Sequence, residues 1–332
     1  MGTRELAVSG DPLAIYRGAR VALVGAAGFI GRWVARALSE RGAELTLFVR
    51  DAGSAGPILA RWGVRGDVRA VELEAEGAAA DAIAELRPAV VFNLAGYGVD
   101  RGERDERLAW RLNASLPHEL ALAVAASRDE RWPGQDLVHA GSALEYGTLG
   151  GSLDELSSGR PTTPYGESKL AGTLGMLLAA RDRDARAVCA RLFTVYGPGE
   201  HEGRLLPSLL ATARRLEPLP LTEGEQQRDF TYVEEVAEGL LRIGASDVAT
   251  PHIVNLATGR PASVREFALA AARVLGFPEE LLRFGELPAR PEEMHHGAVT
   301  TLRLQGCTGW KPDLTIEEGI RRTREFLACA LP

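Results

Sequence analysis

In the N-terminal half of the chain, apolar positions form short continuous runs separated by longer stretches with helical periodicity. Val21–Val24 is the first such run and predicts a strand that is buried on both faces. Four further strands are predicted, over 45–49, 89–95, 136–142 and 186–195. Helices are predicted between them, notably over 28–41, 107–127 and 165–180. Strands that alternate with helices of this length predict an α/β fold built on a doubly wound parallel sheet.

The pattern changes after residue 197, where proline and glycine become frequent and loops separate helical stretches such as Ser263–Leu275. We predict an N-terminal extension over 1–18, a sheet domain over 19–197 and a smaller, irregular lobe over 198–332. Segments around 228–257 are expected to return to the sheet domain. An open parallel sheet binds ligands beyond the carboxyl ends of its strands, so we expect a cleft between the sheet and the second lobe.

Composition excludes several classes of function. The chain has 332 residues, a net charge of −7 and a pI near 5.6, whereas a protein that grips nucleic acid needs a basic surface. No apolar run approaches the roughly 18 residues of a membrane span. The N-terminus also lacks the apolar core of a secretion signal, so we expect a cytoplasmic protein with no nucleic-acid or membrane partner.

The potential metal ligands are sparse. The three cysteines are far apart, which suits a reducing compartment and gives no metal-ligand spacing; they are Cys189, Cys307 and Cys329. His295 and His296 are adjacent, but no cysteine or matched acidic cluster accompanies them, so we interpret them as loop residues and expect no metal.

A glycine-rich turn directly follows the first predicted strand and opens the first predicted helix. Its glycines are Gly25, Gly28 and Gly31, in a G-x-x-G-x-x-G spacing. Glycines permit a tight turn and close approach of the backbone to a pyrophosphate, and the helix N-terminus favours the negative charge. The motif therefore predicts a dinucleotide site.

The end of the second strand indicates which dinucleotide binds. A carboxylate there would bond a ribose 2′-hydroxyl and repel a 2′-phosphate. Instead, Val49 stands at that place, Arg50 follows it, and Arg32 lies just after the third glycine. Two guanidinium groups suit a phosphate ester, so we expect NADP(H) to be preferred. NAD(H) remains possible because Asp51 could turn towards the ribose.

Tyr165 and Lys169 are four residues apart and therefore lie on one face of a predicted helix. A phenol is a poor acid–base catalyst at neutral pH, and a nearby ammonium lowers its pKa. Only two of the 38 basic residues are lysines, and one of the two stands at this position. Ser142 ends the fourth predicted strand, where its hydroxyl could hold a substrate oxygen.

Several segments together resemble one enzyme family. They are GAAGFIG at 25–31, ELRPAVVFNLAG at 85–96, HAGSALEYG at 139–147, PYGESK at 164–169, RLFTVYGPG at 191–199, QRDFTYV at 227–233, NLATGRPASV at 255–264 and GWKPDLTIEEGI at 309–320. The chain resembles the extended short-chain dehydrogenases/reductases, in particular the NAD(P)-dependent nucleotide-sugar epimerases, dehydratases and 4-ketoreductases. The resemblance implies a Rossmann-type sheet domain and hydride transfer at a sugar carbon, usually C4.

The resemblance also implies roles for individual residues. Tyr165 would exchange the proton, Lys169 would bind the nicotinamide ribose and tune Tyr165, and Ser142 would bond the reacting oxygen. Further residues expected to line the cofactor site are Phe29, Ile30, Leu73, Leu94, Ala95, Gly96, Asn113 and Leu192. Residues expected to bind the nucleotide sugar, besides Ser142, are Ala143, Thr194, Leu206, Arg228 and Arg290. Thr194 stands where many epimerases carry asparagine, and His201 and Glu202 are further candidates for the sugar pocket.

The reaction depends on what accompanies the hydride transfer. A 4,6-dehydratase needs an Asp-Glu pair after the serine, whereas Ala143 and Leu144 follow here. Glu145 could be a partial substitute or a surface carboxylate. We therefore expect an NADPH-dependent reductase of a nucleotide-linked 4-keto-6-deoxyhexose, with a nucleotide-sugar 4-epimerase as the alternative.

Two further expectations complete the interpretation. A non-catalytic NAD(P)-sensing regulator would lack the Tyr165–Lys169 pair, so we rank that function last. Leucine and alanine stripes on the helices over 107–127 and 165–180, together with the family's four-helix interface, predict a homodimer.

Overall fold

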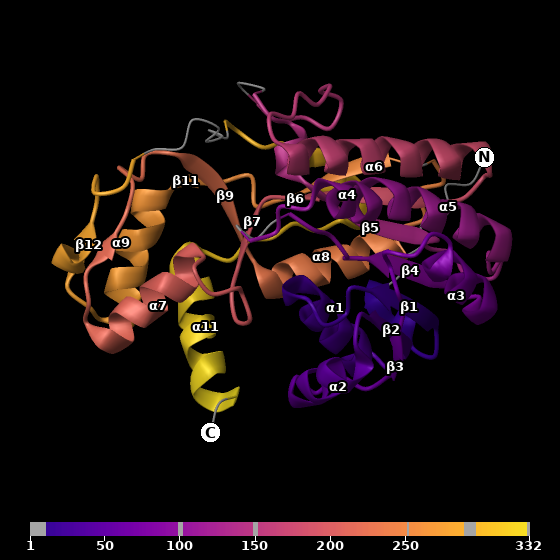
Figure 1. Ribbon diagram of the computed structural model, residues 1–332, viewed down its shortest axis with the longest axis horizontal. Helices are drawn as coiled ribbons and strands as arrows, with labels where there is room; N and C mark the ends of the chain where they lie inside the picture. The colour runs from indigo at the N-terminus through magenta and orange to yellow at the C-terminus, as the bar shows by residue number, and fades with distance from the viewer. Residues whose placement is uncertain (1–10, 99–101, 149–151, 251, 289–296, 331–332) are drawn as a thin grey trace, which may run out of the picture.

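The computed structural model describes residues 11–98, 102–148, 152–250, 252–288 and 297–330. Its centre is a sheet of seven parallel strands in the order β10-β6-β5-β4-β1-β2-β3 (Figure 1). The strands are β1 (Arg20–Val24), β2 (Glu44–Val49), β3 (Asp67–Ala70), β4 (Val90–Asn93), β5 (Leu137–Ser142), β6 (Ala187–Leu192) and β10 (His252–Leu256). This is the predicted Rossmann-type, doubly wound α/β fold, which is confirmed.

Helices cover both faces of the sheet, because successive strand residues point to opposite sides. In β1, Val21 and Leu23 pack on one face, and Ala22 and Val24 pack on the other. The first face is covered by η1 (Pro12–Tyr16), α1 (Phe29–Glu40), α2 (Ala52–Arg61), α8 (Val233–Ala245) and α10 (Leu302–Thr308). The second face is covered by α3 (Ala78–Leu86), α4 (Glu106–Trp110), α5 (Leu116–Ser127) and α6 (Pro164–Asp182).

Two predicted elements are interrupted in the structure. The helix predicted over 107–127 is divided by a π-turn, η2 (Arg111–Ser115), between α4 and α5. The strand predicted over 186–195 ends at Leu192, and the chain then enters a second sheet as β7 (Thr194–Tyr196). Both interruptions lie at the edge of the sheet where the candidate site is built.

The second lobe has its own small core. A three-stranded sheet joins β7 to β9 (Gln227–Tyr232) and β11 (Pro261–Ser263), and a two-stranded one pairs β8 (Leu219–Pro220) with β12 (Leu282–Arg283). Its helical elements are α7 (Leu205–Arg215), α9 (Val264–Leu275), η4 (Glu279–Leu281) and α11 (Ile316–Ala330). Phe230 and Phe267 stack with ring centroids 4.4 Å apart in this core. Between the lobe's segments, α8 and β10 belong to the sheet domain.

The second lobe is anchored against the start of the sheet domain. Phe326 of α11 packs on Trp33 and Trp62, with ring centroids 5.3 Å and 5.1 Å away. Trp33 donates a hydrogen bond from Nε1 to the carbonyl of Pro198, 2.9 Å away, where the chain passes into the lobe. The contact therefore links the lobe to α1, the helix that the glycine turn opens.

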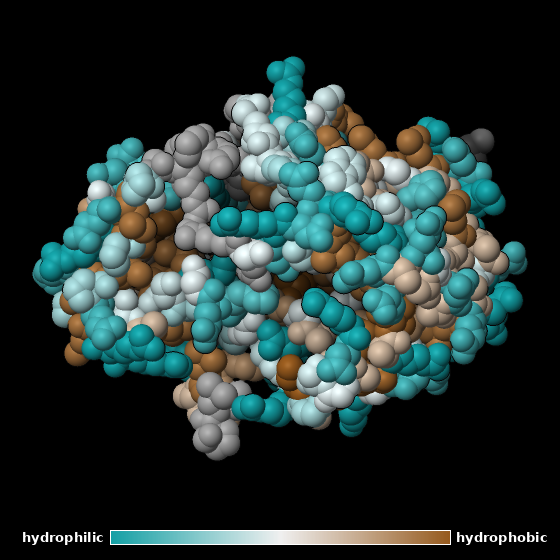
Figure 2. All heavy atoms as spheres, in the orientation of Figure 1, coloured by the Kyte–Doolittle hydropathy of each residue, from teal (hydrophilic) through white to brown (hydrophobic). Residues whose placement is uncertain are grey.

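Among the exposed apolar side chains of the described residues, two lie close together on α6. Leu174 and Leu178 are about one turn apart on this helix, and they are 49% and 50% exposed. Figure 2 shows hydrophobic residues at the surface over the part of the molecule that α5 and α6 occupy in Figure 1. The two helices pack on each other and leave this apolar strip outward.

Candidate active site

The glycine turn between β1 and α1 fits closely against the end of β4. Gly25 has φ +82°, and a Cβ there would lie 2.7 Å from the nitrogen of Ala95. A Cβ at Gly31 would collide with the carbonyl oxygen of Gly25. Gly28 precedes α1 and supplies no side-chain cap, so the first N–H groups of α1, including those of Phe29 and Ile30, can meet an anion. The turn therefore fits a pyrophosphate.

The two arginines proposed for the ribose edge differ in their surroundings. Arg32 donates to the carbonyl oxygens of Gly28 and Gly199, at 3.2 and 2.8 Å, and its guanidinium lies over the Trp62 ring. Burial lowers the pKa of Arg32. Arg50 follows β2 and is exposed. Arg50 therefore reaches solvent at this edge, whereas Arg32 is largely engaged within the protein.

Asp51 is turned away from the role that NAD would require of it. Its carboxylate caps α2 by accepting from the backbone nitrogens of Gly53 and Ser54, at 3.0 and 3.3 Å. Hydrogen bonds from Ser54 and Gly53 hold the pKa of Asp51 below its usual range. The carboxylate next to Arg50 is thus committed to a helix start.

The segment after β4 meets Asn113 and Lys169. A Cβ at Gly96 would lie 3.3 Å from Asn113 Oδ1 and 3.4 Å from Lys169 Nζ. Asn113 is buried in the π-turn, where its Oδ1 accepts from Tyr97 N and its Nδ2 donates to Ser168 Oγ, at 3.0 Å each. The π-turn, a feature common at functional sites, therefore presents the predicted asparagine directly to the strand end.

Lys169 is buried, 4% exposed, and its Nζ donates to the carbonyl of Ala140, 2.9 Å away in β5. Burial lowers the pKa of Lys169, while the charges of Glu145 and Cys189 raise it. Both groups therefore lie at the carboxyl end of β5: Lys169 is held there by its hydrogen bond to Ala140, and Ser142 is the last residue of the strand. Leu192 ends the neighbouring strand β6, paired in register with Ser142.

Tyr165 lies in the first turn of α6, near enough to Ser142 for that side chain to influence the pKa of its hydroxyl. Burial raises the pKa of Tyr165; the Ser142 side chain and the charge of Arg204 lower it, and Glu145 and Glu103 raise it. The net pKa of Tyr165 is therefore raised, whereas the sequence predicted a lowered one, because burial outweighs the neighbouring charges.

Glu145 is neither a surface carboxylate nor a group open to substrate. Its side chain is fully buried and accepts from Arg191 Nε at 2.9 Å. It also accepts from Ser142 N at 2.8 Å and forms a capping box around η3 (Ala143–Glu145). Sequence reasoning missed this pairing, because Glu145 and Arg191 are on separate elements and are joined only by the fold.

The remaining predicted site residues are distributed as follows. Leu206 is buried in the core of the second lobe, so its side chain supports the lobe rather than faces a ligand. Thr194 begins β7, paired in register with Phe230, and Arg228 lies in β9. Ala143 is buried in η3, and Leu73 packs at the margin of the second-face core. Arg290, like His295 and His296, lies outside the described residues.

A carboxylate that the sequence did not single out comes directly after Gly199, whose carbonyl oxygen accepts from Arg32. Glu200 follows Gly199, and its side chain is 6% exposed and 3.5 Å from Arg204 Nε. Burial raises the pKa of Glu200 to about 7. Its neighbours His201 and Glu202, which were candidates for the sugar pocket, are exposed.

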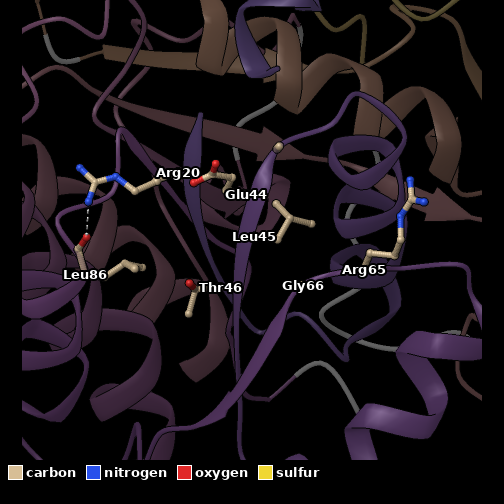
Figure 3. A pocket seen from close by; sticks show the side chains of 8 residues that line it. Arg20, Glu44, Leu45, Thr46, Arg65, Gly66 and Leu86 are labelled. Atoms are coloured by element: carbon tan, nitrogen blue, oxygen red, sulfur yellow. Dashed lines mark hydrogen bonds between the residues drawn. The ribbon is translucent and has the colours of Figure 1, made fainter. Parts of the chain in front are cut away.

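The surface hollow drawn in Figure 3 lies away from these residues. It is lined by Arg20 and Glu44, the first residues of β1 and β2, and by Arg65. The carboxyl ends of the strands, where Ser142 and Gly96 lie, are at the opposite edge of the sheet. The hollow therefore takes no part in the candidate site.

The described ranges contain neither a metal-binding cluster nor a membrane-spanning helix. Within them, no three histidine, cysteine or acidic side chains gather closely enough to hold a metal ion. No helix in the same ranges has the length and apolar character to cross a bilayer.

Known proteins share this architecture. A family model described as the NAD dependent epimerase/dehydratase family matches residues 21–257. A dTDP-6-deoxy-L-talose 4-dehydrogenase (NAD(P)(+)) of Kitasatospora kifunensis is 32% identical over 91% of this chain and 94% of its own. A UDP-glucose 4-epimerase of Mycolicibacterium smegmatis is 28% identical over 74% of this chain and 77% of its own. The structure of MoeE5 in complex with UDP-glucuronic acid and NAD has a TM-score of 0.78 and 26% identity, covering 94% of this chain and 100% of that one.

Proposed function

The chain belongs to the NAD dependent epimerase/dehydratase family of extended short-chain dehydrogenases/reductases, and from this premise we propose that it reduces a nucleotide-linked 4-keto-6-deoxyhexose at C4 with NADPH. The chain is therefore an enzyme of this family. Hydride chemistry at C4 is supported by Tyr165, Ser142 and Lys169, which lie together at the carboxyl end of β5, and the choice of reduction is supported by a relative. A relative that covers nearly the whole chain is named as a 4-dehydrogenase of a 6-deoxy sugar, the same chemistry in reverse.

The side chains have complementary tasks in a ketone reduction. NADPH, when bound, supplies a hydride to the carbonyl carbon. Tyr165, kept protonated by its raised pKa, gives its proton to the carbonyl oxygen as that oxygen becomes negative, which completes the alcohol. Ser142 bonds the same oxygen. Lys169 places a positive charge near the phenolate that remains. Asn113 accepts from the backbone nitrogen of Tyr97 and so holds the segment that follows β4.

The preference for NADPH rests on Arg50. Its exposed guanidinium can bond a 2′-phosphate, while Asp51, the carboxylate that would repel one, caps α2. Arg50→Ala should weaken NADPH binding by about 10-fold or more, since a hydrogen bond to a charged group contributes about 1.5–3 kcal/mol. NADH binding should change little. Fluorescence titration with both dinucleotides measures this, and equal losses would remove the basis for the preference.

A nucleotide-sugar 4-epimerase is the alternative, and the similarity to a UDP-glucose 4-epimerase favours it. The same Tyr165 and Ser142 would serve an epimerase, which returns its hydride to the sugar and leaves no net change in the dinucleotide. A 4,6-dehydratase is less well supported, because Ala143 and Leu144 replace the acid pair and Glu145 is buried in an ion pair. The discriminating experiment uses two substrates: a nucleotide-linked 4-keto-6-deoxyhexose with NADPH, and the corresponding C4 alcohol without added dinucleotide. Net oxidation of NADPH by the ketone supports the reductase, and inversion of the alcohol at C4 supports the epimerase.

We also propose where the substrate and a second copy bind. The nucleotide diphosphate would contact Arg228 and Arg290, with Thr194 and the backbone near Leu206 beside it, at the side of the site that the second lobe covers. The apolar strip of Leu174 and Leu178 on α6 supports a homodimer through α5 and α6.

A further inference from the structure

The end of β5 carries two charged side chains, which approach it from different elements. Lys169 from α6 donates to the carbonyl of Ala140, and Glu145 from η3 accepts from the nitrogen of Ser142, two residues later. The residue between them, Gly141, has no room for a side chain. A Cβ there would lie 2.7 Å from Glu145 Oε1 and would collide with Cys189 Sγ. The carboxylate is therefore pressed against the backbone that presents Ser142.

Every oxygen of the Glu145 carboxylate has a partner. Oε1 accepts from Ser142 N at 2.8 Å and from Thr173 Oγ1 at 3.2 Å, and Oε2 accepts from Arg191 Nε at 2.9 Å. Thr173 lies one turn after Lys169 in α6. The carboxylate thus bonds to the strand that ends in Ser142 and to the helix that carries Tyr165 and Lys169, and it fixes one relative to the other.

Arg191 is held in turn, so the ion pair cannot move freely. Its guanidinium lies over the Tyr146 ring at 4.3 Å, and the Tyr146 hydroxyl donates to Asn255 Oδ1 at 2.7 Å. The side chains of Arg191 and Glu145 are 2% and 0% exposed. A buried carboxylate held at both oxygens and paired with a fixed cation is a rigid charge, not a solvated one.

We propose that Glu145 is a positioning residue, which fixes the hydroxyl of Ser142 for the reacting oxygen and sets a permanent negative charge behind Lys169. The inference rests on the proposed function only for its effect on turnover. The charge has an observable consequence of its own, because it raises the pKa of Lys169 and of Tyr165. The other ionisable groups that face Lys169 are Cys189 on β6 and His139 on β5, and those that face Tyr165 are Arg204 and Glu103.

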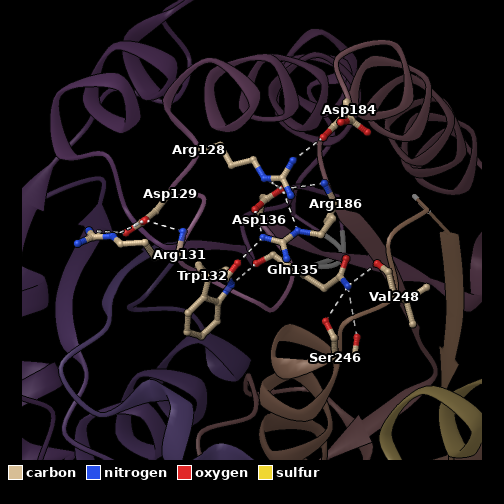
Figure 4. Close-up of polar contacts among 10 residues, drawn as sticks. All are labelled: Arg128, Asp129, Arg131, Trp132, Gln135, Asp136, Asp184, Arg186, Ser246 and Val248. Atoms are coloured by element: carbon tan, nitrogen blue, oxygen red, sulfur yellow. Dashed lines mark hydrogen bonds and ion pairs between the residues drawn. The ribbon is translucent and has the colours of Figure 1, made fainter. Parts of the chain in front are cut away.

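The chain offers a matched control at the other end of the same strand. Asp136 immediately precedes β5, its side chain is 3% exposed, and Arg186 Nη2 donates to it at 2.8 Å (Figure 4). Arg128 lies 3.4 Å from its other oxygen. Asp136→Asn therefore removes a buried carboxylate with arginine partners from β5, far from Ser142. Asp136→Asn should lower the stability of the protein as Glu145→Gln does, but it should leave the pKa of Lys169 and the kcat unchanged.

The first readout uses the two lysines of the chain and needs no substrate. With lysine labelled with ¹³C at Cε, NMR gives one titrating signal for Lys169 and one for Lys311, assigned with Lys311→Arg. Glu145→Gln should lower the pKa of Lys169, because the charge that raises it is removed, and the Lys311 signal serves as the reference. Asp136→Asn should change neither. An unchanged Lys169 in Glu145→Gln, or an equal fall in Asp136→Asn, would overturn the proposed charge effect.

The second readout is steady-state kinetics below the unfolding temperature of each variant. Glu145→Gln should lower kcat on the order of 10- to 100-fold with KM for both substrates nearly unchanged, since Ser142 is displaced but the binding surfaces remain. Wild-type kcat retained by Glu145→Gln would overturn the positioning role. Should Glu145→Gln fail to fold, Glu145→Gln/Arg191→Gln leaves no unpaired buried cation and is measured in its place. A wild-type enzyme inactive on nucleotide sugars would refute the proposed function alone, because the lysine titration still decides the present inference.

Discussion

Replacing Gly31 by alanine tests whether the tight glycine turn is the binding element that the account requires. The added methyl group would collide with the carbonyl oxygen of Gly25 and lie 2.9 Å from that of Ala26. Both atoms belong to the backbone of the turn, so neither can rotate away. The turn itself must widen, and this displaces the N–H groups that would meet a pyrophosphate.

The magnitude follows from two opposing effects. Overpacking a tight site costs about 1–3 kcal/mol, and two backbone collisions put Gly31→Ala near the upper end. Alanine is better than glycine inside a helix by about 1 kcal/mol, which offsets part of that cost. We therefore expect Gly31→Ala to lower the free energy of unfolding by about 2 kcal/mol. The displaced N–H groups should weaken dinucleotide binding by about 10-fold or more.

Gly306 provides the matched control. It lies inside α10, and a Cβ there would meet nothing within 4 Å. Gly306→Ala should therefore raise the free energy of unfolding by about 0.5–1 kcal/mol and leave the dinucleotide affinity unchanged. Urea unfolding and NADPH fluorescence titration measure the two quantities. If Gly31→Ala matched Gly306→Ala in stability and bound NADPH like the wild type, the turn could not be the pyrophosphate site.

Three other predictions concern the proton donor, a buried carboxylate and assembly. Tyr165→Phe should lower kcat by about 10²–10⁴-fold with dinucleotide affinity retained; near-normal turnover would disprove its role as proton donor. Because the pKa of Glu200 is raised from 4.5 to about 7, the wild type should lose up to about 3 kcal/mol of stability as pH rises through this range. Unfolding of Glu200→Gln should lack that loss, and parallel pH curves would contradict the assignment. Leu174→Asp/Leu178→Asp should sediment as a monomer where the wild type is a dimer, and two identical sedimentation profiles would rule out α6 as the interface.

The sequence predicted the central sheet well because its buried strands are continuous apolar runs. The strands observed over Arg20–Val24 and Glu44–Val49 differ from the predicted ones by single residues. The edge strand β3 was not predicted, since Asp67–Ala70 is short and polar and is stabilised by pairing with β2. Helix α2 was missed because it contains Pro57 and two glycines, Gly53 and Gly56.

Chemistry carried by local spacing was equally accessible, whereas chemistry that depends on burial was not. Tyr165 and Lys169 are one helical turn apart, and that pair was predicted from spacing alone. The direction of the Tyr165 pKa was predicted wrongly, because a sequence shows the neighbouring ammonium but not the loss of solvent around the phenol. Glu145 looked ambiguous in the sequence, and only the fold reveals that Arg191, 46 residues away, pairs with it.

The most direct test of the proposed reaction is the stoichiometry of NADPH oxidation with a nucleotide-linked 4-keto-6-deoxyhexose, using dinucleotide that carries deuterium at the transferred position. The account predicts one NADPH oxidised for each alcohol formed, with the deuterium at C4 of the sugar. A sugar product formed with no net oxidation of NADPH, or an alcohol without deuterium at C4, would contradict it.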